Sequence, residues 1–416
     1  MHRVYIYGRG LGFSYFHNCL QKDVEVIAYI DNYSSDLYAE NGIRIIKQSE
    51  IEKNTYDYII VSIIKYDAIR ESLIQAGVPE NQIICFFRYE DAGSGLYDDV
   101  IDPFKWKTQL LWKYNKEVVE PTMNNLFYEM NASKLVETKQ IPTIISAEET
   151  IDILIKEKKS LVRYGDGEFE VMRNHSRHKF QNANAELADR LKEILGNYNA
   201  DILVAIANNY GDLSNYTDDA ANGIRYYMSS EVRKDHMQLL NMGKQYYDAY
   251  VSRPYIIYRD KDKKLMVKKF NHIKSIWQDQ KVLIVEGKHT RFGVGNDMLN
   301  NASDVIRILA PDKNAFDYYD DIFETVKKYA TNRLTLIVLG PTATVLAYDL
   351  ASLGHWALDI GQVDTEYEWF CRGVSERCDV PYKTVSEYAD KNMFTDIDEP
   401  FRKKYLDEIV DAVGDV

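Results

Sequence analysis

The sequence predicts an α/β protein made of two parallel-sheet domains. Short apolar runs alternate with amphipathic segments through residues 1–90, and the same alternation returns from residue 141 onward. Strands that alternate with helices imply a parallel sheet with right-handed crossovers. Several apolar runs end in glycine and charged residues, which is typical of the strand ends where such sheets bind ligands.

The composition is that of a globular protein, because 45% of the 416 residues are hydrophobic and 28% are charged. This length predicts two or three domains. We find no apolar run near the roughly 18 residues of a membrane span and no signal peptide. The four cysteines form no Cys-x-x-Cys pair, which indicates free thiols and a cytoplasmic location. The net charge of −13 argues against nucleic acid or an anionic membrane as the main partner.

The first predicted domain covers residues 1–90. Asp31 follows a glycine turn by about 20 residues, as a ribose-binding acid would. The glycines at positions 8, 10 and 12 nevertheless depart from the dinucleotide pattern Gly-x-Gly-x-x-Gly. Nucleotide binding therefore stands beside a second interpretation, a module for packing, oligomerisation or partner binding. The segment resembles the Rossmann-like modules of bacterial sugar-modifying proteins. We expect strands at 4–7, 24–30, 58–63 and 83–87, and helices ending near Gln21 and over 66–76.

Residues 91–140 are predicted to be a helical connector, and residues 396–416 an acidic C-terminal tail that contains a surface helix. Between them, residues 141–395 form the second α/β domain. Ser146 to Glu149 make a capping box ahead of its first helix. The connector helices are expected at 104–118 and 124–136. The second domain is expected to have strands at 161–162, 202–207, 282–285, 305–309, 334–339 and 357–360, and helices at 150–156, 185–195, 229–250 and 345–352.

Four polar loops of the second domain follow predicted strands, at residues 163–168, 287–297, 340–344 and 361–369. In a parallel sheet the carboxyl ends of the strands meet at one edge. We therefore expect all four loops to face one crevice.

The first loop, Arg163-Tyr164-Gly165-Asp166-Gly167-Glu168, offers two carboxylates one residue apart. The flanking glycines let the backbone approach a ligand closely. A divalent cation that bridges a diphosphate needs one or two carboxylates from the protein, so Asp166 and Glu168 are candidate metal ligands. Arg163 would contact phosphate or clamp Asp166. A solvated Asp-Gly turn is the alternative. His175 and His178 are further metal candidates, although we favour a surface loop for both.

The loop at 287–297 combines three glycines with basic and polar side chains. It lacks the spacing of a Walker loop, but its backbone amides could form a nest for a diphosphate, with Lys288 and Arg291 adding charge. A structural β–α turn is the alternative. In the loop at 361–369, Asp364, Glu366 and Glu368 precede Trp369, and such carboxylates can supply a general base; an exposed acidic loop is the alternative here.

Residues from about 141 to 390 resemble the bacterial GT-D family of glycosyltransferases. The resemblance rests on several blocks that occur in the right order. Gln362 departs from the family pattern, which has histidine there. The blocks are the motif at 163–168, Ser252-Arg253-Pro254-Tyr255, Val285-Glu286-Gly287 with the run 290–297, Gly340 to Leu350, and Glu366-Tyr367-Glu368-Trp369.

The resemblance implies a Rossmann-like fold distinct from the two common glycosyltransferase folds. It also implies metal-dependent transfer of a hexose, with glucose as the expected sugar, from a UDP-sugar to a glycan of a bacterial surface glycoprotein or polysaccharide. Asp166 and Glu168 would hold Mn²⁺ or Mg²⁺. Asp364 or Glu366 would deprotonate the acceptor hydroxyl if the reaction inverts the anomeric configuration, and a retaining reaction would need a different assignment. The residues assigned to donor binding are Arg163, Gly165, Gly167, Lys288, Thr290, Arg291, Gly293, Asn296, Asp297 and Thr342.

Two alternatives remain beside this hypothesis. Gln362 raises the alternative of an inactive subunit that binds a nucleotide-sugar. A nucleotide-sugar oxidoreductase or epimerase would use the N-terminal domain, but the Tyr-x-x-x-Lys pair that short-chain enzymes of that class need is missing from the sequence. The expected partners are thus a UDP-sugar donor and a glycan or glycoprotein acceptor, with oligomerisation or partner binding through residues 1–90.

Overall fold

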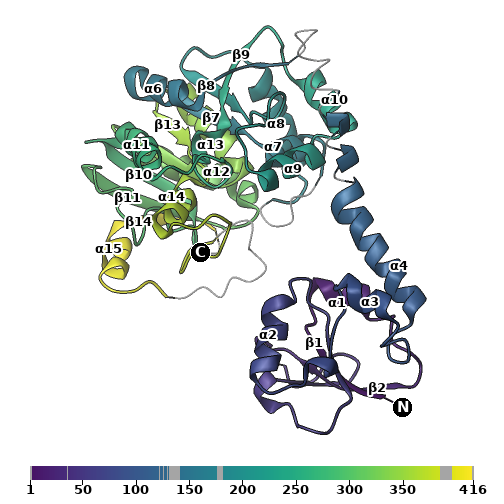
Figure 1. Ribbon diagram of the computed structural model, residues 1–416. Helices are drawn as coiled ribbons and strands as arrows, with labels where there is room; N and C mark the ends of the chain where they lie inside the picture. Colours follow the sequence, from purple (N-terminus) through teal and green to yellow (C-terminus); the bar gives the residue numbers. More distant parts are fainter. Residues whose placement is uncertain are drawn as a thin grey trace. The chain divides into compact units, whose positions relative to one another are not determined.

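The chain forms two compact units, Met1–Met123 (unit 1) and Asn124–Val416 (unit 2). A computed structural model describes residues 2–34, 36–120, 122–124, 126–128, 130, 141–175, 181–384 and 396–414. Each unit is built around a sheet whose strands run parallel in every pairing of the described residues (Figure 1). The predicted class, α/β with two parallel sheets, is confirmed.

Unit 1 contains a five-stranded sheet in the order β3-β2-β1-β4-β5. The four predicted strands are present, and β3 is a short strand that the sequence analysis missed. The strands are β1 His2–Tyr7, β2 Val24–Ile30, β3 Arg44–Ile46, β4 Tyr58–Val61 and β5 Ile83–Cys85. The helices are α1 Leu11–Phe16, α2 Asp67–Gln75 and α3 Tyr89–Ser94, with short 3-10 turns η1 Gln48–Glu50 and η2 Glu80–Gln82.

The glycine turn after β1 serves close packing. A Cβ atom at Gly12 would lie 2.0 Å from the backbone oxygen of Ser62, so α1 rests directly on the chain that leaves β4. Asp31, the predicted ribose ligand, instead accepts backbone hydrogen bonds from Tyr33 and Ser34 at 3.0 and 3.1 Å. These contacts favour the packing interpretation of this turn.

The predicted connector at residues 91–140 is divided between the two units. Trp106 of α4 (Pro103–Tyr114) is fully buried in unit 1, where its indole Nε1 donates to the oxygen of Phe86 at 2.7 Å. A π-helical turn, η3 (Asn115–Val119), continues α4. Tyr128 is buried in the core of unit 2 and donates to the oxygen of Asn209 at 2.6 Å. The end of the predicted helix at 124–136 lies outside the described residues.

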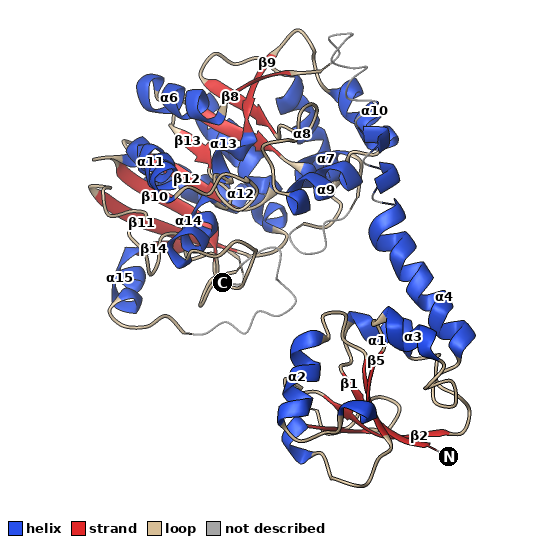
Figure 2. Ribbon diagram, viewed as in Figure 1, coloured by secondary structure: helices blue, strands red, loops and turns tan. Residues whose placement is uncertain are grey.

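Unit 2 contains a nine-stranded sheet in the order β14-β11-β10-β12-β13-β7-β8-β9-β6, and helices surround it (Figure 2). The strands are β6 Thr143–Ile145, β7 Ser160–Tyr164, β8 Ile202–Ile206, β9 Gln245–Asp248, β10 Lys281–Gly287, β11 Asp304–Ala310, β12 Leu334–Val338, β13 Ala357–Asp359 and β14 Ile409–Ala412. The helices are α6 Ala147–Glu157, α7 Asp166–Met172, α8 Ala185–Gly196, α9 Asp218–Tyr227, α10 Ser230–Leu239, α11 Lys263–Lys274, α12 Tyr319–Tyr329, α13 Pro341–Ser352, α14 Val363–Arg372 and α15 Phe401–Glu408. The described residues of unit 2 also include the 3-10 turns η4 Ala249–Ser252, η5 Ser275–Trp277 and η6 Ala315–Tyr318.

The long apolar runs become central strands, because a parallel sheet covered on both faces buries its side chains on both sides. All five residues of β8 are buried, as are six of the seven in β10. The predicted helix at 229–250 is wrong over its second half, where the chain forms β9 from the polar and aromatic run Gln-Tyr-Tyr-Asp. The predicted cap is present, since the Ser146 side chain accepts from the backbone amide of Glu149.

The C-terminal tail contains the predicted helix, α15, and then β14, which joins the sheet beside β11. Arg307 of β11 ties this segment to the sheet. Its guanidinium, 2% exposed, lies 2.6 Å from Glu286 Oε1 and 2.7 Å from Glu408 Oε2. Glu286 is fully buried and also accepts from the Phe292 amide at 2.7 Å. In the described part of the chain, no helix is long and apolar enough to cross a membrane.

We predict that Arg307→Ala lowers the free energy of unfolding by about 3–5 kcal/mol, because it leaves Glu286 and Glu408 without their buried cation. Urea unfolding followed by circular dichroism measures this change. Lys327→Ala, which breaks an exposed pair with Glu324, is the control and should cost less than about 1 kcal/mol. Equal effects of the two variants would contradict a structural role for the Arg307 network.

Candidate functional site

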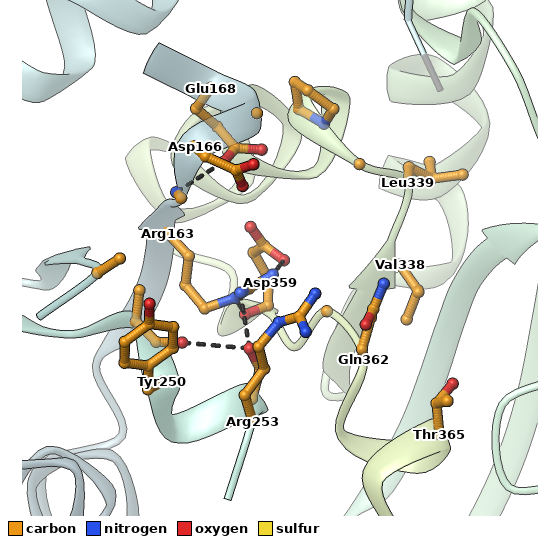
Figure 3. A pocket seen from close by; sticks show the side chains of 18 of the residues that line it. Arg163, Asp166, Glu168, Tyr250, Arg253, Val338, Leu339, Asp359, Gln362 and Thr365 are labelled. Carbon is orange, nitrogen blue, oxygen red and sulfur yellow. Dashed lines mark hydrogen bonds and ion pairs between the residues drawn. The ribbon is translucent and has the colours of Figure 1, made fainter. Parts of the chain in front are cut away.

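The four predicted loops line one cavity of about 1080 Å³ at the carboxyl edge of the unit 2 sheet (Figure 3). The lining residues from these loops lie at or just after the ends of β7, β10, β12 and β13: Arg163, Gly165, Asp166, Gly167 and Glu168; Gly287, His289, Thr290 and Phe292; Gly340 and Pro341; and Gly361, Gln362, Asp364 and Thr365. The expectation that these loops share a crevice is therefore confirmed. Loops after β8, β9 and β11, one helix (Asp218–Tyr227, α9), Arg377 and Thr384 also contribute to the wall.

Asp166 and Glu168 lie in the first turn of α7, the helix that follows β7. Asp166 is exposed, whereas Glu168 is partly buried and its Oε2 accepts from the amide of Gly165 at 2.7 Å. Burial raises the pKa of Glu168 to about 7, and the nearby carboxylate of Asp359 adds to the rise. The structure thus brings both predicted metal ligands to the cavity wall.

The guanidinium of Arg163 pairs with a carboxylate other than that of Asp166, the partner that the sequence analysis considered within the protein. Its guanidinium lies 2.6 Å from Asp359 Oδ1, and it also donates to the backbone oxygen of Asp359 at 2.9 Å and to Ser252 Oγ at 2.7 Å (Figure 3). Gly361 makes room for it, because a Cβ atom there would lie 2.3 Å from Nη2. Arg163 therefore clamps Asp359 across strands β7 and β13 instead of Asp166. Because Arg163 also lines the cavity, its predicted contact with phosphate stays a prediction.

Four backbone amides of the loop at 287–297 already have partners inside the protein. The backbone amides of Lys288, His289, Thr290 and Phe292 all donate within the protein, to Ala310 O, Asp312 Oδ1, Gly287 O and Glu286 Oε2. Because these four amides already donate to acceptors within the protein, they are not available to bind a diphosphate. Gly287 and Thr290 do line the cavity.

The remaining donor-binding candidates of this loop lie off the cavity wall. The Lys288 side chain is exposed, and Arg291 donates to the oxygen of Tyr382 at 2.7 Å. Asp297 lies 2.9 Å from Lys274 Nζ, in a separate polar hollow. Gly293 packs against Leu299, because a Cβ atom added to this glycine would lie 2.6 Å from the Leu299 side chain. The Asn296 side chain donates to the carboxylates of Asp364 and Glu368. Thr342, the candidate from the next loop, is fully buried in α13.

The acidic run at 364–368 forms helix α14, and its carboxylates are buried. Asp364 lines the cavity, but its Oδ1 accepts from Asn296 and its Oδ2 lies 2.7 Å from Lys383 Nζ. Glu366 is fully buried and accepts from the amides of Tyr255 and Ile256 at 2.9 and 2.8 Å. A side chain without exposed surface cannot reach an acceptor hydroxyl, so we assign Glu366 an anchoring role.

Sequence reasoning missed several residues of the wall. Asp359 ends a short buried strand, and Arg253 follows η4. Lys313 and Arg377 add positive charge, and Tyr250 donates to Asn209 Oδ1 at 2.6 Å. Usable signals existed for Asp359, an acid at the end of an apolar strand, and for Arg253, which lies in the block 252–255 that carries the family resemblance.

Asp166 and Glu168 supply two carboxylates, fewer ligands than a metal site made entirely of protein groups would need. Within the described ranges, no group of three or more His, Cys, Asp or Glu side chains could hold a metal ion. His175, one of the two histidine candidates, has its Nδ1 at 2.6 Å from Glu170 Oε2. His178 lies outside the described residues.

Family models match a part of each unit. The family described as glycosyltransferase GT-D fold matches residues 161–388, and a family described as C2185-like, N-terminal, matches residues 1–84. The chain is 34% identical over 275 residues to a probable glycosyl transferase Gly of Streptococcus gordonii, a match that covers 66% of this chain and 39% of that protein. It is 33% identical over 298 residues to the glycosyltransferase GlyD of Streptococcus pneumoniae serotype 4, covering 71% and 36%. The chain thus spans well under half the length of these relatives.

Solved structures agree with this match. A structure of the domain of unknown function 1792, described as a distinct glycosyltransferase fold, aligns with a TM-score of 0.63 and 31% identity over 68% of this chain and 100% of that one. A second, described as a new glycosyltransferase from Streptococcus sanguinis, aligns with a TM-score of 0.61 and 33% identity over 66% and 100%. The fold predicted for unit 2 is confirmed.

We predict that Glu168→Gln stabilises the metal-free protein increasingly as pH rises. A pKa raised to about 7 means that the folded state favours protonated Glu168, so this stabilisation is present at low pH and lost as pH rises through about 7. At about pH 8 the gain should reach at most about 3 kcal/mol. Urea unfolding at several pH values measures it.

Glu170→Gln on the same helix is the matched control. Burial opposes ionisation of Glu170, but hydrogen bonds from His175 and Arg173 outweigh it and lower the pKa. Neutralising this residue should therefore destabilise the protein at neutral pH, the opposite sign. A pH-independent effect of Glu168→Gln would show that the folded environment does not disfavour its charge.

Proposed function

The chain belongs to the GT-D-fold family of glycosyltransferases, and on that basis we propose that it transfers a hexose, glucose by expectation, from a UDP-sugar to a glycan. The acceptor would be part of a bacterial surface glycoprotein or polysaccharide, and the reaction would take place in the cytoplasm. One observation carries the proposal: Asp166 and Glu168 lie on the wall of a cavity that also gathers basic side chains from other strand ends.

The donor set at Asp166 and Glu168 fits a Mn²⁺ or Mg²⁺ ion whose other ligands are phosphate oxygens and water, because such ions are commonly held by one or two carboxylates plus substrate phosphates. A cation bound there would neutralise charge on the departing diphosphate. Since the pKa of Glu168 is raised to about 7, we expect cation binding to release a proton and to tighten as pH rises.

Arg253 and Lys313 are better placed than Lys288 and Arg291 to contact the diphosphate, because both line the cavity. Arginine can form two parallel hydrogen bonds to phosphate oxygens, while lysine supplies a point charge. Stabilising charge as it develops on the leaving group is the main contribution expected of such residues. Gln362 also lines the cavity and would contact the bound sugar-nucleotide.

We predict that the wild-type protein releases UDP from one member of a UDP-sugar panel and that this release requires the metal ion. In Asp166→Asn the rate of release should fall by at least about 100-fold, because metal stabilisation of the leaving group contributes several kcal/mol. The measurement compares Mn²⁺ with EDTA. Asp297→Asn, a predicted donor ligand that the structure places in a separate hollow, is the matched control and should remain active.

Three results would contradict the proposed activity or the proposed place of the donor. Binding of UDP without turnover of any donor would favour the inactive nucleotide-sugar-binding subunit. Loss of activity in Asp297→Asn with an active Asp166→Asn would place the donor in the other hollow. Reduction of a nicotinamide cofactor with a nucleotide-sugar would instead favour the oxidoreductase alternative.

We assign unit 1 to recognition of the acceptor, of a partner or of a second copy of the chain. Unit 1 has its own buried cores, so removal of residues 1–123 should leave UDP-sugar hydrolysis intact. Transfer to a polymeric acceptor should fall, by about 100-fold if the unit tethers the acceptor. Circular dichroism checks the fold of the shortened protein. Loss of UDP binding would contradict this assignment.

A further inference from the structure

A histidine–aspartate pair that the sequence analysis did not consider as a base also lines the cavity. His289 follows β10 and Asp312 follows β11, and both belong to the cavity wall. The His289 amide donates to Asp312 Oδ1 at 2.9 Å, and His289 Nδ1 lies 2.5 Å from Asp312 Oδ2. One carboxylate therefore fixes both the backbone and the ring of the same histidine.

The glycine before this histidine makes the arrangement possible. A Cβ atom at Gly287 would lie 2.6 Å from Asp312 Oδ1 and 3.1 Å from its Cα, so the carboxylate occupies the space of the missing side chain. The backbone amide of Thr384 also donates to the oxygen of His289 at 2.8 Å. The position of the imidazole is thus set by contacts on both sides of its backbone.

The orientation has a chemical consequence. A carboxylate that accepts from Nδ1–H selects the tautomer whose Nε2 carries a lone pair, and it stabilises the imidazolium once Nε2 gains a proton. The side chains of His289 and Asp312 are 24% and 26% exposed. The pair therefore combines access from the cavity with a fixed ring orientation, the two requirements of a general base.

The predicted bases satisfy these requirements less well. Asp364 bonds to Asn296 and Lys383, and Glu366 is fully buried. Asp359 is held by Arg163, and Asp166 and Glu168 are assigned to the cation.

We propose that His289, oriented by Asp312, is the general base that activates the acceptor hydroxyl, an inference that rests on the proposed function. The acceptor oxygen forms a bond to the anomeric carbon as its proton passes to His289 Nε2. The bond from that carbon to the β-phosphate oxygen breaks, and its electron pair leaves with UDP. This direct displacement inverts the anomeric configuration, and Asp312 balances the imidazolium charge.

The test measures kcat for transfer at saturating donor in His289→Gln, His289→Ala and Asp312→Asn. We expect His289→Gln to lower kcat by about 100- to 10,000-fold, the usual contribution of a general base, while KM for the donor changes little. Added imidazole should restore part of the activity of His289→Ala, because it can replace the missing ring. It should restore none of the activity of Asp312→Asn, because the His289 ring is still present in that variant. The transferred sugar should have inverted configuration by nuclear magnetic resonance.

A second histidine–aspartate pair supplies the matched control. His272 Nε2 lies 2.9 Å from Asp152 Oδ1 on α11 and α6, outside the cavity wall, so His272→Gln should keep wild-type kcat. Calorimetric binding of UDP and circular dichroism check that the His289 variants are folded. Wild-type kcat in folded His289→Gln, or retention of configuration, would overturn the inference and leave the proposed function standing. Absence of turnover in the wild type with every donor would overturn both.

Discussion

The seam between β7 and β13 is the constraint on which the site depends. The two strands share a single registered pair, Leu161 with Leu358, yet they join the two halves of the unit 2 sheet. Arg163 strengthens this seam through its bonds to Asp359 and Ser252. Ligands of open parallel sheets bind at the carboxyl ends of the strands, and here the cavity draws on both halves of the sheet, with the metal candidates following β7 on one half and residues of the 287–292 loop following β10 on the other.

Several charged residues of the sequence motifs are buried, and they hold the loops of the site together through ion pairs and hydrogen bonds. Lys383 is buried between Asp364 and Glu368, and Asn296 bridges the same two carboxylates. A buried charge is tolerated only when it is paired and hydrogen-bonded. The motifs therefore combine two roles: some of their side chains line the cavity, and others fix the loops that form its wall.

The fold and the place of the site were predictable from the sequence because both depend on local patterns. Apolar runs that end in polar residues mark strands and their carboxyl ends. Individual roles depend on contacts far along the chain, such as Arg163 with Asp359. Helix geometry also decides which acids face inward: residues 364 and 365 reach the cavity, while Glu366, on the same short helix, turns toward Tyr255. The sequence analysis predicted a phosphate-binding loop around His289. The contact of His289 with Asp312 could not be predicted, because the two residues lie 23 positions apart and follow different strands.

The seam also has a consequence for how unit 2 folds. Strands β6 to β9 come from one stretch of chain and β10 to β13 from the next, so each half of the sheet can form from contacts closer in sequence than those across the seam. Pairing β7 with β13 closes a much longer loop, and such closure is slow and entropically costly. We therefore expect the two halves to assemble first and to dock last. The cavity straddles the docked halves, so the ability to bind a ligand would arise only in the final step of folding.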